Sequence, residues 1–90
     1  MSTQEKRRES RRLANGEVRV KFTDPEPLQI EGKLIDVSAG GFRMAHDCTA
    51  LRSGQVVSFA HVEARGRAQV MWTRILVESV ESGFLVVGRS

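Results

Sequence analysis

The chain has 90 residues, of which 40% are hydrophobic and 28% charged, with a formal net charge of +3 and a single cysteine. A chain of this length forms one domain with a thin core, which argues against a large internal catalytic cavity. No apolar run approaches the roughly 18 residues of a membrane span, and no apolar segment follows the basic start as in a secretory signal. We therefore expect no membrane insertion. The lack of a secretory signal and the single cysteine, which cannot form an internal disulfide, together favour a cytoplasmic protein.

The positive charge is concentrated at the N-terminus. Residues 1–12 hold five basic and two acidic residues, whereas the remaining residues hold nine of each. Residues 1–16 contain little that is apolar beyond Leu13 and Ala14, and they end at the turn pair Asn15 and Gly16. We predict that residues 1–16 form a basic arm that is mobile on its own, and that residues 17–90 form the folded body. Because the arm is positively charged, we expect it to bind an anionic partner.

Six short strands are predicted in the body from the alternation of apolar and polar residues. They are expected over residues 17–23, 28–37, 42–44, 55–62, 67–74 and 84–87. Turns or loops are expected at residues 24–27, 47–54, 63–66 and 81–83. No segment has the long 3.6-residue apolar period of a helix. We therefore predict an all-β protein, a small six-stranded antiparallel β-barrel in which closure removes exposed strand edges, with no long C-terminal helix.

Individual residues of these strands carry further expectations. Gly32 predicts a bulge or a bend in the second strand. Val70 and Trp72 alternate onto one face of the fifth strand, so we expect Trp72 in the core or at the barrel rim rather than as a platform for a base. His46 and His61 have no neighbours at metal-ligand spacing, so we predict no metal site and ordinary strand positions for both.

The stretch DVSAGG combines an acid, a hydroxyl and two glycines between strand-like runs. In an extended strand Asp36 and Ser38 point to the same face, which then offers a carboxylate beside a hydroxyl. Gly40 and Gly41 follow, and their lack of a β-carbon lets a ligand approach the backbone N–H groups closely. This stretch is the candidate binding site.

The arm supplies cations that match this site. The candidate ligand-binding bases are Lys6, Arg7, Arg8, Arg11 and Arg12. An RxxxR spacing occurs twice, as Arg7 with Arg11 and as Arg8 with Arg12, and both registers stay open. We prefer the first because Lys6 then stands directly ahead of the motif. Arg43, on the strand that leaves the glycines, either borders a ligand or faces solvent, and we expect solvent.

These two motifs resemble those of the PilZ domain, a bacterial receptor module for cyclic di-GMP. That family has an RxxxR near its N-terminus and a (D/N)xSxxG further along, which Asp36, Ser38 and Gly41 match here. The stretches VMW at residues 70–72 and GFLVV at residues 83–87 are also similar to the family. Many members continue into a C-terminal helix, whereas this sequence ends soon after its last predicted strand.

The resemblance implies a receptor that binds and releases cyclic di-GMP. An arginine fork matches the O6 and N7 atoms of guanine and can also pair with phosphate. Asp36 would accept from guanine N1 and N2 or orient an arginine, and Ser38 would donate to the ligand. The arm would clamp the dinucleotide against the DxSxxG turn and alter a surface read by a protein of motility, pilus or exopolysaccharide machinery. One or two dinucleotides per domain are equally compatible with these charges.

Other functions remain as alternatives. A domain of this fold could act by protein contact alone, although it would not need both motifs. A small barrel that binds single-stranded nucleic acid would need aromatic residues on an open face. Four Phe, one Trp and no Tyr, mostly in inward phase, supply few of these. No paired carboxylates, Ser/His/Asp set or metal-ligand set stands at a recognisable spacing, so we predict neither an enzyme nor a cofactor.

Overall fold

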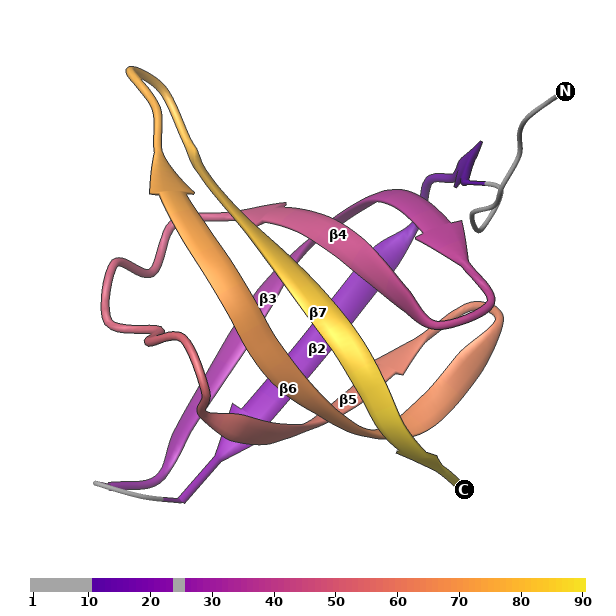
Figure 1. The fold of residues 1–90 in the computed structure, drawn as a ribbon. Helices are drawn as coiled ribbons and strands as arrows, with labels where there is room; N and C mark the ends of the chain where they lie inside the picture. Colours follow the sequence, from indigo (N-terminus) through magenta and orange to yellow (C-terminus); the bar gives the residue numbers. More distant parts are fainter. Residues whose placement is uncertain (1–10, 24–25) are drawn as a thin grey trace, which may run out of the picture.

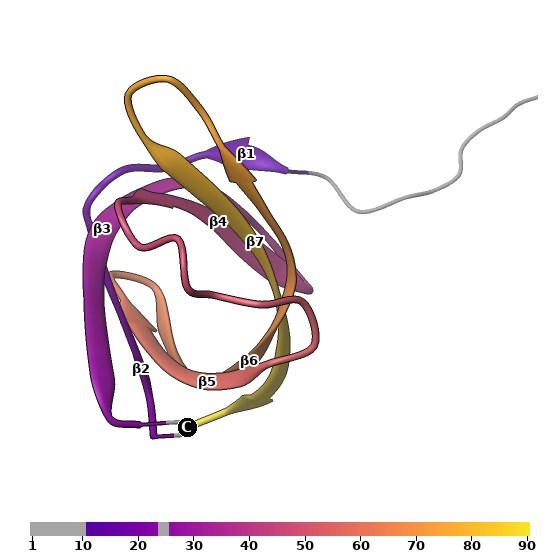
Figure 2. The same cartoon turned by 90° about the vertical axis from the view of Figure 1, so that its left-hand side faces the viewer.

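The computed structural model describes residues 11–23 and 26–90, which form a closed antiparallel β-barrel (Figures 1 and 2). Its strands are β1 (Arg12–Leu13), β2 (Glu17–Phe22), β3 (Leu28–Ser38), β4 (Gly41–His46), β5 (Val56–His61), β6 (Ala64–Ile75) and β7 (Val80–Arg89). The order β3-β2-β5-β6-β7-β4 closes because β4 also pairs with β3. The prediction of an all-β, six-stranded antiparallel barrel is confirmed. Within the two described ranges, no helix is long and apolar enough to cross a membrane.

β1 lies outside the closed barrel and lengthens its wall. It pairs with Asp36 and Val37 of β3, beyond the part of β3 that pairs with β2. β4 pairs with the same two residues from the opposite edge, so β1 continues the line of β2. The backbone N–H of Ala14 adds a hydrogen bond to the carbonyl of Ile35 at 3.0 Å.

This pairing moves the predicted boundary between arm and barrel. Residues 12–14 are hydrogen-bonded to β3, although the sequence predicts an arm over residues 1–16. β3 is longer than β2, so its last residues have an edge whose backbone groups need partners. A short strand meets that need through its backbone, whatever its side chains are. Lys6, Arg7 and Arg8 lie outside the described residues.

The barrel interior is filled by apolar side chains from all six closed strands and from one loop residue. These residues are Val18, Val20, Phe22, Ile30, Leu34, Val37, Phe42, Met44, Leu51, Val57, Phe59, Ala68, Val70 and Phe84. Phe42 lies among the aromatic rings, with its centroid 4.7 Å from that of Phe84 and 4.9 Å from that of Phe59. The strict alternation predicted for β2 is confirmed, because its apolar residues are all buried.

Two β-bulges decide which side chains of β3 and β6 reach the outer face. The pairing of β3 with β4 shifts between Leu34 and Asp36, so Leu34 and Val37 both reach the core while Asp36 points away from it. The pairing of β6 with β7 shifts between Val70 and Trp72. An extra residue reverses the alternation of a strand. The expectation that Val70 and Trp72 share one face is therefore wrong.

Of the bulge or bend predicted at Gly32, the bulge is not there. Gly32 pairs with Val18 in the regular register of β2 and β3. A Cβ at this position would lie 2.1 Å from the carbonyl oxygen of Ala45 on β4. Glycine is therefore needed because two strands pass very close to each other, a contact that composition alone does not distinguish from a bulge.

β6 and β7 form a long hairpin that projects beyond the barrel (Figure 1). The sequence predicts a turn at residues 81–83, but the chain turns at residues 76–79, where the N–H of Leu76 donates to the carbonyl of Ser79 at 2.8 Å. Gly83 lies within β7, where a Cβ would be 2.4 Å from the indole of Trp72. Its small size serves packing rather than a turn.

A buried polar cluster joins β4, β6 and β7 inside the barrel. The Nδ1 atom of His46 accepts from the backbone N–H of Cys48 at 3.0 Å, so its proton is on Nε2, which donates to Ser82 Oγ at 2.8 Å. Ser82 Oγ is also 2.8 Å from Thr73 Oγ1. Burial lowers the pKa of His46, against a smaller opposing effect of Asp47. The fold therefore requires the neutral imidazole.

We expect the free energy of unfolding to fall as the pH is lowered from about 7.5 to about 5.5, because the unfolded chain takes up a proton at the ordinary histidine pKa of about 6.5 that folded His46 resists. Between the unfolded and the lower folded pKa, one such group contributes a slope of roughly 1.4 kcal/mol per pH unit. Urea unfolding at a series of pH values measures this slope.

Two variants separate the contributions of the histidines, because burial also lowers the pKa of His61. His46→Gln keeps a donor toward Ser82 but does not titrate, so its slope should be smaller than that of the wild type. The pH dependence that remains in His61→Gln and disappears in the double variant belongs to His46. An unchanged slope in His46→Gln would contradict the prediction.

Candidate functional site

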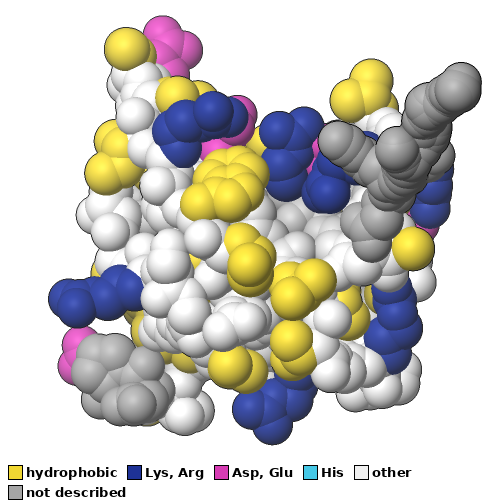
Figure 3. Space-filling view, in the orientation of Figure 1, with side chains coloured by type: hydrophobic (Ala, Val, Ile, Leu, Met, Phe, Trp, Pro, Cys, Tyr) yellow, Lys and Arg dark blue, Asp and Glu magenta, His cyan; other side chains and the backbone are white. Residues whose placement is uncertain are grey.

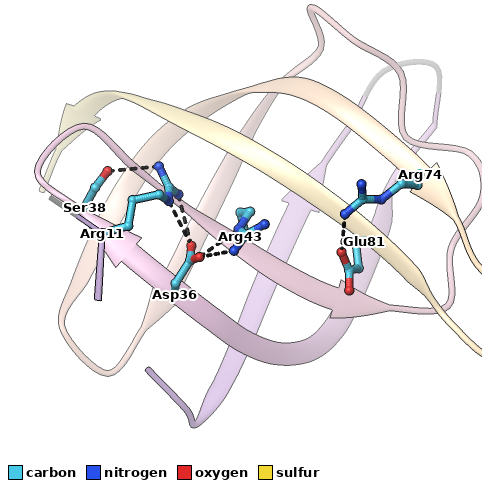
Figure 4. Close-up of polar contacts among 6 residues, drawn as sticks. All are labelled: Arg11, Asp36, Ser38, Arg43, Arg74 and Glu81. Atoms are coloured by element: carbon cyan, nitrogen blue, oxygen red, sulfur yellow. Dashed lines mark hydrogen bonds and ion pairs between the residues drawn. The ribbon is translucent and has the colours of Figure 1, made fainter. Parts of the chain in front are cut away.

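The carboxylate of Asp36 lies between two guanidinium groups on the outer face of the barrel (Figure 4). Arg11 donates to Oδ1 from Nε at 3.2 Å and from Nη2 at 3.1 Å. Arg43 donates to Oδ2 from Nε at 2.8 Å and also from Nη2. The side chain of Asp36 is 4% exposed, whereas those of Arg11 and Arg43 are 41% and 34% exposed. A buried anion is thus covered by two cations that still reach solvent.

The charges of this cluster keep the Asp36 carboxylate ionised and favour an anionic ligand. Burial raises the pKa of Asp36, but the hydrogen bonds from Arg43 and Arg11 outweigh burial and hold this pKa below its usual range. One negative and two positive side chains leave the cluster with a surplus of one positive charge at neutral pH. Such a surplus of positive charge attracts anions.

The hydrogen bonds also define what Asp36 can do in this arrangement. A carboxylate has about four lone-pair sites. Two N–H groups of Arg11 and two of Arg43 occupy that number. Asp36 therefore orients the two arginines here, which is one of the two roles expected from the sequence. It can accept from a ligand only when one arginine withdraws.

Arg11 also reaches the hydroxyl of the motif. Its Nη1 donates to Ser38 Oγ at 3.3 Å. Asp36 and Ser38 therefore share one face, as the alternation of the strand predicts. The contact joins an arginine of the N-terminal RxxxR motif to Ser38 of the DxSxxG motif, 27 residues further along the chain.

Arg12 lies elsewhere, although it is the neighbour of Arg11. It forms an ion pair with Glu63 in the connection between β5 and β6, and its Nη1 donates to Glu63 Oε2 at 2.9 Å. Hydrogen bonding to Arg12 is the main cause that lowers the pKa of Glu63. The structure thus brings Arg11, and not Arg12, to Asp36. Arg7 and Arg8 lie outside the described residues, so the choice of register stays a prediction.

A hollow of about 430 Å³ lies beside this cluster on the outer face of the barrel. Its lining residues are Arg11, Gly40, Gly41, Arg43, Met71, Trp72, Gly83, Phe84 and Leu85. Figure 3 shows this face, where hydrophobic side chains over β6 and β7 lie next to Lys and Arg side chains. The hollow therefore places cations and apolar surface side by side.

Two of the residues that line the hollow, Gly41 and Gly83, must be glycine because neighbouring groups leave no room for a β-carbon. A Cβ on Gly41 would lie 2.0 Å from the carbonyl oxygen of Phe84. Gly83 pairs with Arg43 on one side and with Trp72 on the other, and its missing side chain makes room for the indole. Arg43 and Trp72 thus lie on the two strands that flank Gly83, and the indole occupies the space left by the absent side chain.

Two residues of this site were placed wrongly or incompletely from the sequence. Arg43 was expected to face solvent, but it is hydrogen-bonded to Asp36. A two-residue turn at residues 39–40 places Arg43 opposite Asp36 in the hairpin of β3 and β4. Assuming such a tight turn from the sequence would have predicted this pair. Trp72 was expected in the core or at the barrel rim. It is not in the core but lines the hollow, and no feature of the apolar pattern indicates the bulge that turns it outward.

No known protein-family model matches the chain, and a search of curated proteins finds no match. In the part of the chain that the structure describes, no group of three or more His, Cys, Asp or Glu could hold a metal ion. The His46 and Ser82 contact has the wrong polarity for nucleophile activation, because His46 donates to the hydroxyl instead of accepting its proton.

We expect Gly41→Ala to destabilise the barrel by at least about 1–3 kcal/mol, because the new methyl group would overlap the backbone of β7. Urea unfolding measures this loss. Gly88→Ala is the matched control, since a Cβ at Gly88 meets nothing within 4 Å, and it should change stability by no more than about 0.5 kcal/mol. Equal stability of both variants would contradict the packing role of Gly41.

Proposed function

We propose that this domain is a receptor for cyclic di-GMP and that Arg11, Asp36 and Ser38 form the centre of its binding site. One observation carries the proposal: Arg11 donates to both Asp36 and Ser38. This contact joins the RxxxR and DxSxxG motifs through which the sequence resembles PilZ domains. The identity of the ligand comes from that resemblance, and the chemistry of the site supports it.

The donors of the site suit a guanine dinucleotide. Each guanidinium carries five N–H donors. Arg11 and Arg43 each use two of them on Asp36. Remaining donors can pair with a phosphodiester or with the O6 and N7 edge of guanine. The indole of Trp72, which lies against Gly83 and lines the hollow, gives a planar base a surface to lie against.

Binding would exchange partners within the cluster. Arg11 is the more exposed of the two arginines that hold Asp36, so ligand oxygens can compete for it more readily. When Arg11 turns to the ligand, Oδ1 of Asp36 becomes available to accept from guanine N1 and N2. Asp36 would thus orient the arginine in the empty site and read the base in the filled one.

Several contacts must form together for useful affinity. A micromolar complex requires a net free energy of about 8 kcal/mol, whereas a bidentate contact to guanine contributes about 1–3 kcal/mol. Arg11 and Arg43 alone do not reach that sum. The proposal therefore assigns further contacts to Lys6, Arg7 and Arg8, outside the described residues.

The same exchange offers a route to a partner protein. Arg11 directly precedes β1, and Arg12 of β1 is paired with Glu63 between β5 and β6. A ligand that redirects Arg11 would therefore alter the surface along β1 and this connection. We assign that surface to a partner in motility, pilus or exopolysaccharide machinery, as the resemblance implies.

Calorimetric titration with cyclic di-GMP, GMP, cyclic di-AMP and a short RNA tests the proposal. We expect selective binding of cyclic di-GMP. Arg11→Ala and Asp36→Ala should each weaken it by about tenfold or more, the equivalent of about 1.4 kcal/mol, because each removes a charge-assisted contact. Circular dichroism should show that both variants stay folded.

Arg12→Ala is the matched control for Arg11→Ala, since it removes the same side chain one residue along the chain. We expect it to retain affinity within a few-fold, because Arg12 points to Glu63. Comparable binding of RNA would favour a nucleic-acid-binding barrel, and no binding of any nucleotide would favour a protein-interaction adaptor. An equal loss in both arginine variants would overturn the choice of register.

A further inference from the structure

The β6–β7 hairpin ends in apolar side chains that no part of the described chain covers. Ile75 is 66% exposed, Leu76 39% and Val77 101%. Figure 1 shows this hairpin end projecting at the upper left, and in Figure 3 hydrophobic and acidic side chains occupy the same place. Three consecutive apolar residues in water are avoided on the surface of a monomeric domain unless they serve an interaction.

The hairpin end is held in a defined shape. Arg74 Nη2 donates to Glu81 Oε1 across the two strands at 2.9 Å, and the guanidinium lies 5.4 Å from the centroid of the Trp72 ring. The backbone bond from Leu76 to Ser79 closes the turn. A preformed projection loses little conformational entropy when it docks, so these contacts prepare residues 75–78 for binding.

The charge at the hairpin end indicates what kind of surface it fits. Glu78 follows the three apolar residues directly and is itself exposed. A carboxylate at this position opposes insertion into a lipid surface, because it is costly to bury and is repelled by anionic headgroups. It favours a pocket with apolar walls and a basic rim.

The same chain carries such a pocket at its other end. A hollow of about 650 Å³ is lined by the apolar residues Phe22, Leu28, Val56 and Val57 and by the basic residues Lys21 and Arg67, among others. Leu28 and Val56 are each 42% exposed, so the hollow offers apolar surface to a binding partner. Figures 1 and 2 show the end of β2 and the start of β3, whose residues Phe22 and Leu28 line this hollow, at the opposite end of the barrel from the β6–β7 turn. A copy therefore cannot fill its own hollow.

The geometry points to head-to-tail self-association, in which residues 75–78 of one copy dock into the hollow of a second copy. The apolar side chains cover Leu28 and Val56, and Glu78 meets Lys21 or Arg67. Each copy then still offers one unused hairpin end and one unused hollow, so the contact builds open chains or closed rings rather than two-fold dimers. The contact is small, so association is weak and depends on protein concentration. It does not require a nucleotide.

Sedimentation of the full chain between roughly 10 µM and 1 mM, a range suited to a weak complex, tests the inference. We expect the average mass of the wild type to rise with concentration beyond that of a dimer. Val77→Asp and Leu28→Asp should each stay monomeric, because each puts a carboxylate into the apolar contact. An equimolar mixture of the two variants should form dimers, since one intact hairpin end and one intact hollow remain.

Two further variants check the specificity of the contact. Val62→Asp alters a residue that is 70% exposed in the connection between β5 and β6, and it should associate like the wild type. Glu78→Lys should weaken association, and so should the double variant Lys21→Glu, Arg67→Glu. A mixture of the two should restore association beyond a dimer, because each hairpin end then meets a hollow of opposite charge on the other variant. All these positions are at the surface, and circular dichroism checks that the variants stay folded.

Three results would overturn the inference. The first is a wild type that remains monomeric over the whole range. The second is self-association that the mixture of Val77→Asp and Leu28→Asp fails to restore, which would indicate a symmetric interface. The third is Val77-dependent binding to phosphatidylserine–phosphatidylcholine vesicles without self-association, which would assign the hairpin end to a lipid surface.

Discussion

The buried carboxylate of Asp36 is the constraint on which the outer face of this barrel depends. An ionised group so far from solvent must be paired, because an unpaired buried charge costs several kcal/mol. Arg11 and Arg43 meet that requirement from two different segments, one ahead of β1 and one on β4. The pairing therefore attaches the start of the described chain to the barrel. It also presents two guanidinium groups to the neighbouring hollow, so stability and binding capacity rest on the same contacts.

The bulges allow a polar site on a domain whose core is too thin to hold one. An extra residue in β3 turns Asp36 outward while Leu34 and Val37 still fill the interior. A second extra residue, in β6, does the same for Trp72. The hollow thus lies on the outer wall of the barrel. The core stays apolar except for the cluster around His46, whose polar groups form hydrogen bonds with one another and with the backbone.

The β6–β7 hairpin connects the two surfaces for which we propose partners. Trp72 lines the hollow beside Arg43, and it also lies under the guanidinium of Arg74. Arg74 in turn braces the projecting end of the hairpin through Glu81. The proposed nucleotide site and the apolar hairpin end therefore share one element, although each proposal rests on its own contacts and is tested by its own experiment.

The sequence by itself determined the fold class and part of the geometry of the candidate site. Strand alternation has a period of two residues and is local, so it was enough to predict the barrel, the buried residues of β2 and the shared face of Asp36 and Ser38. Tertiary structure alone decided the bulges, the pairing of Arg43 with Asp36, the attachment of β1 and the turn at residues 76–79. These features depend on which strands become neighbours and in which register, and backbone hydrogen bonds that set register leave little trace in side-chain pattern.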